Sequence, residues 1–238
     1  MPTNPTVVLV HGALTDASVW HGVIALLQHQ GTTVFAPSLP MRSFDSDVAY
    51  LHSVLETLDG SLLVVAHSYA GSVVSAPDAL TPAVQALVFV AAFQQDTGES
   101  AGGLNGQFPG SKLTPDNLVI RPYPGGNEVY VRPDRFAEIY AADVPADHAA
   151  VMAAAQHPFD ASTLGGSFAG PPTWRTLPFW AIVSTADVSI PTEALRFMAQ
   201  RAGSSTSEVD SSHAVPVSNP QAVAEVIRTA AASAAPVG

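Results

Sequence analysis

The stretch LLVVAHSYAG, residues 62–71, decides how this chain folds. Five apolar residues end abruptly at the polar pair His67 and Ser68, and small residues follow. A short apolar run with these limits is typical of a buried strand in a parallel sheet, and the residues after it can begin a helix. A serine at such a sharp strand-to-helix turn presents its hydroxyl at the end of the sheet, which makes Ser68 a candidate nucleophile.

The usual sequence of such a turn is Gly-x-Ser-x-Gly, but here alanine stands at positions 66 and 70, with Gly71 one place later. Alanine is the next smallest side chain, so the steric requirement for small residues is still met. The alternative interpretation is that Ser68 only caps an ordinary helix, a position that serine often occupies.

Apolar strand patterns and helical stripes alternate on both sides of this stretch. Strands are expected at residues 6–10, 32–36, 62–66, 84–91 and 179–183, with a weaker one at 207–209. Helices are expected at residues 19–30, 46–58, 69–76, 192–202 and 220–232. This alternation predicts an α/β fold, a mostly parallel sheet with helices on both faces.

The alternation stops between residues 94 and 177, where Gly- and Pro-rich turns surround two helical stretches, 135–142 and 146–156. We therefore expect one domain, 1–238, whose core (1–93 and 178–238) carries an inserted helical cap. Most aromatic residues of the cap are expected to pack in its own small core.

The composition excludes several classes of function. The 238 residues are 47% hydrophobic and 12% charged, with a net charge of −11 and a single lysine, Lys112. This balance disfavours nucleic acid and anionic membranes as partners. The sequence has no cysteine and no HExxH, P-loop or strand-linked GxGxxG pattern, so we expect neither a metal nor an organic cofactor. Without a signal peptide or an apolar run of roughly 20 residues, we expect a soluble, cytoplasmic protein, and a homodimer stays open.

Four polar residues fall at or just after predicted strand ends, where parallel α/β sheets bind ligands: His11, Ser68, Asp187 and His213. The order serine, aspartate, histidine is the one expected of α/β-hydrolases. A serine needs a base to remove its proton, an imidazole can do this near neutral pH, and a carboxylate orients the ring.

Both partners of Ser68 have rivals in the sequence. The other histidines fall on predicted helices or in the cap, and His67 is expected to be a packing or hydrogen-bonding neighbour. Asp96 follows the fourth strand, but Asp187 has the better place in chain order. His11-Gly12-Ala13 follows the first strand, where the Ala13 N–H could join the Tyr69 N–H as donors to an oxyanion. The alternative there is a glycine turn with a satisfied histidine.

Six stretches together resemble the α/β-hydrolase superfamily along nearly the whole chain: VVLVHGA (7–13), VAHSYAG (65–71), ALVFVAAF (86–93), DTGES (96–100), TADVSIP (185–191) and SHAV (212–215). The sequence is similar to compact bacterial esterases that include pyrethroid-hydrolysing enzymes, and more distantly to plant methyl esterases and hydroxynitrile lyases. The resemblance implies Ser68, Asp187 and His213 as a catalytic triad and Ala13 and Tyr69 as oxyanion donors. Because the first strand begins so near Met1, two leading strands of that fold are expected to be missing, which predicts six strands.

The sequence therefore predicts a serine carboxylesterase that hydrolyses a small to medium neutral hydrophobic ester through an acyl-enzyme. An amide or carbamate substrate stays open, as does a non-catalytic small-molecule receptor. A hydroxynitrile lyase-like enzyme is a further alternative. The lyases that this sequence resembles use a lysine near the catalytic histidine, and the absence of a lysine near His213 in the sequence counts against this alternative. We expect the substrate pocket to be lined by four residues: Trp20, Phe93, Met152 and Trp174.

Overall fold

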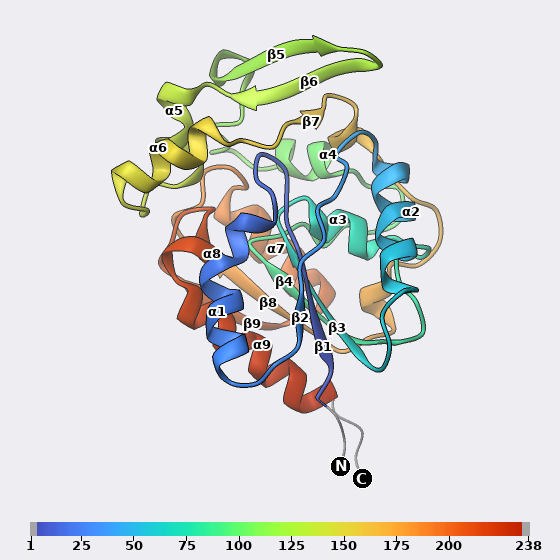
Figure 1. Cartoon of the computed structure of the whole chain (residues 1–238). Helices are drawn as coiled ribbons and strands as arrows, with labels where there is room; N and C mark the ends of the chain where they lie inside the picture. Colours follow the sequence, from blue (N-terminus) through green and yellow to red (C-terminus); the bar gives the residue numbers. More distant parts are fainter. Residues whose placement is uncertain (1–3, 235–238) are drawn as a thin grey trace.

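A six-stranded parallel sheet forms the centre of the computed structural model, which describes residues 4–234 (Figure 1). The strand order is β2-β1-β3-β4-β8-β9. The bounds are β1 (Thr6–Val10), β2 (Val34–Phe35), β3 (Leu62–His67), β4 (Val84–Val90), β8 (Phe179–Ser184) and β9 (Ser205–Val209). The predicted number of strands and their parallel arrangement are confirmed. The strand order reverses direction between β1 and β3, the place where such sheets bind ligands.

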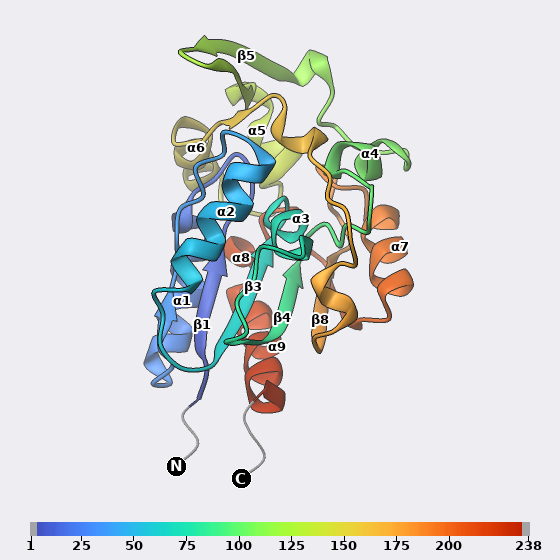
Figure 2. The same ribbon diagram turned by 90° about the vertical axis from the view of Figure 1, so that its right-hand side faces the viewer.

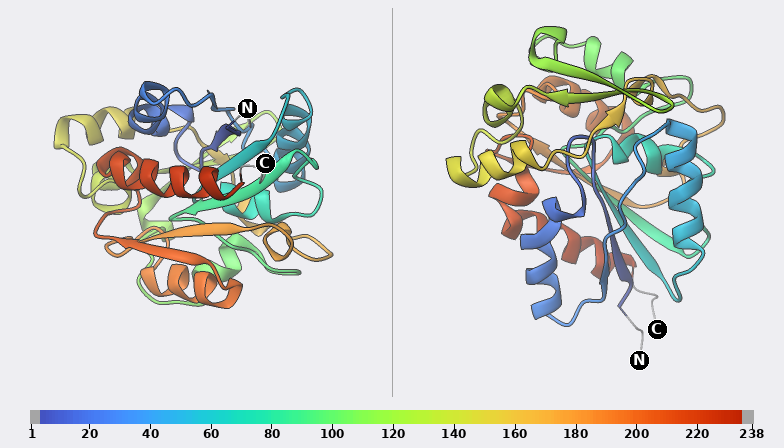
Figure 3. Two further views of the ribbon diagram at one scale, coloured as in Figure 1. Left: turned by 90° about the horizontal axis from the view of Figure 1, so that it is seen from below. Right: turned by 45° about the horizontal axis from the view of Figure 1, so that its top comes forward.

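Helices cover both faces of the sheet. One face carries α1 (His21–His29) and α9 (Pro220–Ala234), and the other carries α2 (Phe44–Leu55), α3 (Ala70–Ser75) and α7 (Thr192–Ala202) (Figures 1 and 3). The central strands are buried on both sides, which explains why β3 is apolar from Leu62 to Ala66 instead of alternating. Helix α2 begins two residues earlier than expected, because Ser43 and Ser46 form a reciprocal cap at its start.

The segment between β4 and β8, which we continue to call the cap, contains more than the predicted helices. Helices α4 (Ala101–Gly106), α5 (Pro133–Tyr140) and α6 (Ala146–Ala154) are joined by a three-stranded antiparallel sheet, β5 (Leu118–Tyr123), β6 (Gly126–Val131) and β7 (Phe159–Asp160). The β5–β6 hairpin lies at the far end of the cap from the central sheet (Figures 1 and 2). The hairpin was not predicted because Pro122, which lies within it, argues against a strand. Proline is tolerated here because β5 is an edge strand.

Short helical segments connect the remaining parts: α8 (Val215–Ser218) and four single 3-10 turns at Ala17–Trp20, Pro115–Asn117, Thr163–Gly165 and Thr173–Arg175. Among residues 4–234, no helix has the length and apolar character needed to cross a bilayer.

Helix α3 passes so close to the loop after β4 that Gly71 has no room for a side chain. A Cβ atom at this position would lie 2.2 Å from the Phe93 carbonyl oxygen and 2.9 Å from the Ala92 Cβ. We expect Gly71→Ala to lower the free energy of unfolding by on the order of 3 kcal/mol, because backbone must move to admit the methyl group. Urea unfolding measures this. Gly106→Ala is the control, because nothing lies within 4 Å of a Cβ there, and equal losses in both variants would contradict the explanation.

Candidate active site

Ser68 occupies a strained turn between β3 and α3. Its φ angle is +56°, a left-handed conformation that residues other than glycine rarely adopt. The turn is held by backbone hydrogen bonds, since the Ser68 carbonyl accepts from Gly71 N–H (3.0 Å) and Phe93 N–H (3.2 Å). Ala66 and Ala70 are fully buried in this turn, so the chain forms it without the two usual glycines. Such strain is typical of functional sites.

The side chains of Ser68, His213 and Asp187 form one hydrogen-bonded line. His213 Nε2 lies 2.8 Å from Ser68 Oγ, and His213 Nδ1 lies 2.6 Å from Asp187 Oδ2. All three residues are buried. A carboxylate can only accept, so Nδ1 carries the proton and Nε2 is free to accept from the Ser68 hydroxyl. The structure thus brings the three predicted residues together in the geometry that nucleophilic attack by serine requires.

Two backbone N–H groups hold Asp187 in place. Its second oxygen, Oδ1, accepts hydrogen bonds from Ser189 N–H (2.8 Å) and Ile190 N–H (3.0 Å). The rival carboxylate, Asp96, instead forms an ion pair with Arg175 (2.7 Å). Asp187 is therefore the carboxylate that contacts the histidine.

His67 supports His213 through the backbone. Its Nε2 lies 2.9 Å from the His213 carbonyl oxygen, and the two rings are 4.9 Å apart. Burial and the neighbouring His213 lower the pKa of His67 well below its usual value, so the ring is neutral and donates this hydrogen bond. The structure places His67 where the sequence expected it, as a hydrogen-bonding neighbour of the serine turn.

The backbone N–H groups of Ala13 and Tyr69 are available beside Ser68. Both residues line the same cavity as Ser68 and His213, and within residues 4–234 neither N–H donates a hydrogen bond to another protein group. Gly12 allows this approach, since a Cβ there would lie 2.5 Å from the Ser68 Cβ. The next residue but one, Leu14, has a φ of +69° and turns the loop around the cavity. This arrangement can hold a negative oxygen formed next to Ser68.

His11 fixes the shape of this loop. Its Nε2 accepts a hydrogen bond from Leu39 N–H (2.9 Å), so its Nδ1 donates to the Gly12 carbonyl (2.8 Å). Burial lowers the pKa of His11 to about 4. The ring is thus neutral and links the loop after β1 to the segment before α2. This agrees with the interpretation of His11-Gly12 as a glycine turn with a hydrogen-bonded histidine.

The buried His11 should make the fold sensitive to acid. Because its pKa in the folded state lies below the unfolded value near 6.5, its contribution to stability is complete above pH 6.5 and is lost as the pH falls towards 4. For this residue alone the loss between pH 7 and pH 5 is about 2 kcal/mol. His11→Gln keeps an acceptor for Leu39 but does not titrate. Urea unfolding at both pH values should therefore show about 2 kcal/mol less acid destabilisation in His11→Gln than in the wild type; equal losses would contradict this account.

The cavity in front of Ser68 is narrow and mostly apolar. Its walls come from the core, the loop after β1 and the cap: Leu14, Phe93, Ala101, Asn105, Leu113, Tyr140, Phe159, Leu164, Ser189 and Ile190. Four of these residues, Asn105, Leu113, Phe159 and Leu164, also line a more open groove in the cap. The cavity at Ser68 and this groove are therefore neighbours on the two sides of these four residues.

Of the four residues expected to line the pocket, the structure places only Phe93 there. Trp20 is fully buried beside His67, with the rings 6.0 Å apart. Trp174 packs against Phe179 and donates its indole N–H to the Gln95 carbonyl (3.0 Å). Both tryptophans serve packing, so their assignment to the pocket was wrong.

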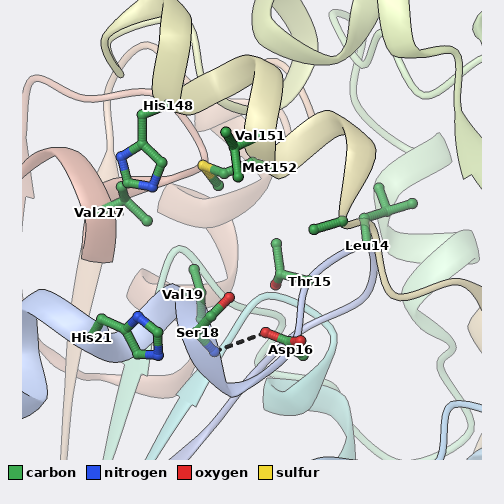
Figure 4. Close-up of a pocket in the computed structure, with 11 residues that line it drawn as sticks. Leu14, Thr15, Asp16, Ser18, Val19, His21, His148, Val151, Met152 and Val217 are labelled. Atoms are coloured by element: carbon green, nitrogen blue, oxygen red, sulfur yellow. Dashed lines mark hydrogen bonds between the residues drawn. The ribbon is translucent and has the colours of Figure 1, made fainter.

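Met152 belongs to a second groove. It lies on α6 and lines this groove together with Val19 and His148 (Figure 4). Leu14 borders both this groove and the cavity that contains Ser68. The assignment of Met152 to the substrate pocket was therefore also wrong, because α6 lies over the loop after β1 and not over the serine.

The cap supplies contacts to His213 that the sequence analysis missed. The Tyr140 ring meets His213 edge-on at 4.8 Å, and its hydroxyl lies 3.2 Å from Thr15 Oγ1. Asp143 accepts hydrogen bonds from the Ser212 side chain and, at 3.1 Å, from the Ser212 N–H. No sequence signal links residues 140–143 to position 213, because the cap's path over the sheet depends on tertiary packing.

Comparison with known proteins agrees with this fold. A model of the Alpha/beta hydrolase family matches residues 7–226. A pyrethroid hydrolase from Sphingobium faniae JZ-2 is 22% identical with a TM-score of 0.75, covering 97% of this chain and 98% of its own. A methylesterase from Arabidopsis is 18% identical with a TM-score of 0.77, covering 96% and 99%. Tomato methylketone synthase I with 2-tridecanone is 18% identical with a TM-score of 0.79, covering 97% and 99%. At these identities the likeness shows a shared fold.

A search of curated proteins by sequence finds no match. In the part of the chain that the structure describes, no three His, Asp or Glu side chains lie together in a way that could bind a metal ion.

Proposed function

Because the chain belongs to the alpha/beta hydrolase family, we propose that it is a serine carboxylesterase whose nucleophile is Ser68. The observation that carries this proposal is the buried line from Ser68 through His213 to Asp187. At its Ser68 end lie Ala13 and Tyr69, whose backbone N–H groups have no protein acceptor among residues 4–234. Each part of this arrangement has a role in acyl transfer.

The first half of the reaction forms an acyl-enzyme. His213 Nε2 takes the proton of the Ser68 hydroxyl while Oγ attacks the ester carbonyl carbon. The carbonyl oxygen becomes negative and accepts hydrogen bonds from the Ala13 and Tyr69 N–H groups. When the C–O bond of the ester breaks, His213 gives its proton to the departing alcohol.

The second half releases the acid. Water gives a proton to His213 and attacks the acyl carbon, and the resulting oxyanion meets the same two donors. His213 then returns the proton to Ser68 Oγ, and the carboxylic acid leaves. Asp187 keeps the imidazole in the correct orientation and stabilises its cationic form throughout.

The cavity favours a neutral, apolar ester of small to medium size. Most of its lining surface is apolar, with leucine, isoleucine, phenylalanine and alanine side chains, and no lysine or arginine lines it to bind an anionic substrate. Lys112, the lysine of the cap, pairs with Glu138 (2.6 Å) at the surface. It is thus not placed to assist His213 as a lyase would need.

Covalent labelling tests the proposal. A fluorophosphonate should add once to the folded enzyme, and peptide mass spectrometry should find the label on Ser68. Enzyme unfolded in urea is the control, because Ser68 reacts only when His213 is in place. A label on another residue, or equal labelling of the unfolded chain, would refute Ser68 as the nucleophile.

A further inference from the structure

Asp47 is a buried carboxylate that takes no direct part in the proposed chemistry. It lies in the first turn of α2, with none of its surface exposed. Its Oδ2 accepts a hydrogen bond from the Tyr69 hydroxyl (2.9 Å), and its Oδ1 accepts one from the Met41 N–H (2.9 Å). Burying a charged group costs free energy unless the group is well hydrogen-bonded. The presence of a carboxylate at this buried position therefore needs an explanation, and its two hydrogen bonds offer one.

The first of these contacts leads to the oxyanion donor. Tyr69 directly follows Ser68 and borders the cavity, and its side chain is buried. Within residues 4–234 the Tyr69 hydroxyl makes no hydrogen bond other than the one to Asp47. Because only two rotatable bonds separate the ring from the backbone, fixing the phenol restricts where the N–H of residue 69 can point.

The second contact leads to the cavity wall. Met41 has a φ of +58°, and its carbonyl accepts a hydrogen bond from the Asp160 N–H (2.8 Å) in β7. The neighbouring residue in β7, Phe159, lines the cavity. Asp47 therefore connects the serine turn with the part of the cap that borders the substrate.

The helix that carries Asp47 is firmly held at this end. Ser43 and Ser46 cap the start of α2. Phe44 stacks on Phe168 of the cap, and Gly166 leaves the space that Phe44 fills, since a Cβ there would lie 2.1 Å from the Phe44 Cβ. Although burial raises the pKa of Asp47 to about 6, the group is largely ionised at pH 7 and accepts both hydrogen bonds.

We propose that Asp47 is a positioning residue, which sets the Tyr69 N–H for the oxyanion through one oxygen and the Phe159 wall through the other. This inference rests on the proposed function. The two contacts predict different kinetic effects: loss of the Tyr69 contact should act on kcat, and loss of the Met41 contact should act on KM.

The test compares variants on p-nitrophenyl butyrate. Tyr69→Phe removes only the hydroxyl and should lower kcat about tenfold with KM unchanged, because a displaced donor acts in the transition state alone. Asp47→Ala should lower kcat and also raise KM. Asp47→Asn keeps an acceptor for Met41 and should restore KM. Tyr130→Phe is the matched control, because it removes a similar hydroxyl–carboxylate hydrogen bond (Tyr130 to Glu128, 2.7 Å) far from the serine turn.

Hydrogen exchange provides a readout that needs no turnover. Exchange of the amides in residues 66–72 should be faster in Tyr69→Phe than in the wild type and Tyr130→Phe. Wild-type kcat in a folded Tyr69→Phe, or an equal loss in Tyr130→Phe, would overturn the positioning role. If the wild type itself neither turns over esters nor labels at Ser68, the proposed function fails instead, and unchanged exchange in Tyr69→Phe would still reject the inference.

Discussion

Replacing Ser68 by alanine is expected to lower kcat for p-nitrophenyl acetate and butyrate by about 10⁵- to 10⁶-fold, the largest effect of any single change in this chain. The variant keeps the cavity and the two N–H donors but has no oxygen for His213 to deprotonate. No acyl-enzyme can then form, and only the weak reaction of water in a favourable site remains. KM need not change, because the hydroxyl contributes to bond formation and not to binding of the apolar groups.

A second serine provides the control for this measurement. Ser72 lies one helical turn further along in α3 and is also buried, and its Oγ has no hydrogen-bond partner among residues 4–234. Ser72→Ala should therefore fold and keep kcat within about twofold of the wild type. If Ser68→Ala and the wild type turn over the esters at the same rate, Ser68 is not the nucleophile.

The parallel sheet explains why three distant residues could be predicted together. Ser68 follows β3, Asp187 follows β8, and His213 lies in the loop after β9. The carboxyl ends of parallel strands share one edge, so residues that are far apart in sequence meet there once the strands are recognised. Apolar runs identified β3 and β8, while β9 was only a weaker candidate because its sequence is polar. Chemistry and chain order then separated Asp187 from Asp96.

The cap could not be derived in the same way. Its β5–β6 hairpin contains Pro122 and partly exposed residues, a pattern that resembles a turn-rich loop. The pocket residues were misjudged for a related reason: Trp20 and Trp174 are large and apolar, and composition does not distinguish a buried wall from a cavity wall. The contact of Tyr140 with His213 depends on where α5 is placed in the folded chain, which residue spacing does not reveal.

Asp47 shows a third kind of limit. Nothing about an acidic residue in a predicted helix indicates burial, yet Asp47 is fully buried and contacts Tyr69. Nothing in the spacing of residues 47 and 69 marks that contact. The burial of a polar residue can be recognised only when the position of the neighbouring element in the fold is known. For Asp47 that element is the turn containing Ser68.

The second large effect is expected for Asp187→Asn, which should lower kcat by about 10⁴-fold while leaving the fold intact. The reason lies in the two N–H groups of Ser189 and Ile190, which donate to Oδ1 of Asp187. In the asparagine variant these donors retain the amide oxygen, so the amide NH₂ must face His213 Nδ1. An NH₂ group donates, so Nδ1 becomes an acceptor and the ring proton moves to Nε2. Nε2 can then no longer accept the proton of Ser68.

The rival carboxylate makes this prediction selective. Asp96→Asn weakens an exposed ion pair with Arg175 and should change kcat by less than about twofold. The two variants are compared by kcat on p-nitrophenyl butyrate and by urea unfolding, and the loss in Asp187→Asn should lie in kcat and not in stability. In Asp187→Asn the activity is lost because the His213 tautomer cannot accept the proton of Ser68. Labelling of Ser68 by a fluorophosphonate needs the same proton transfer, so it should slow in the same proportion as kcat. A large loss in Asp96→Asn with normal activity in Asp187→Asn would assign the carboxylate to the loop after β4 and reject the line drawn through His213.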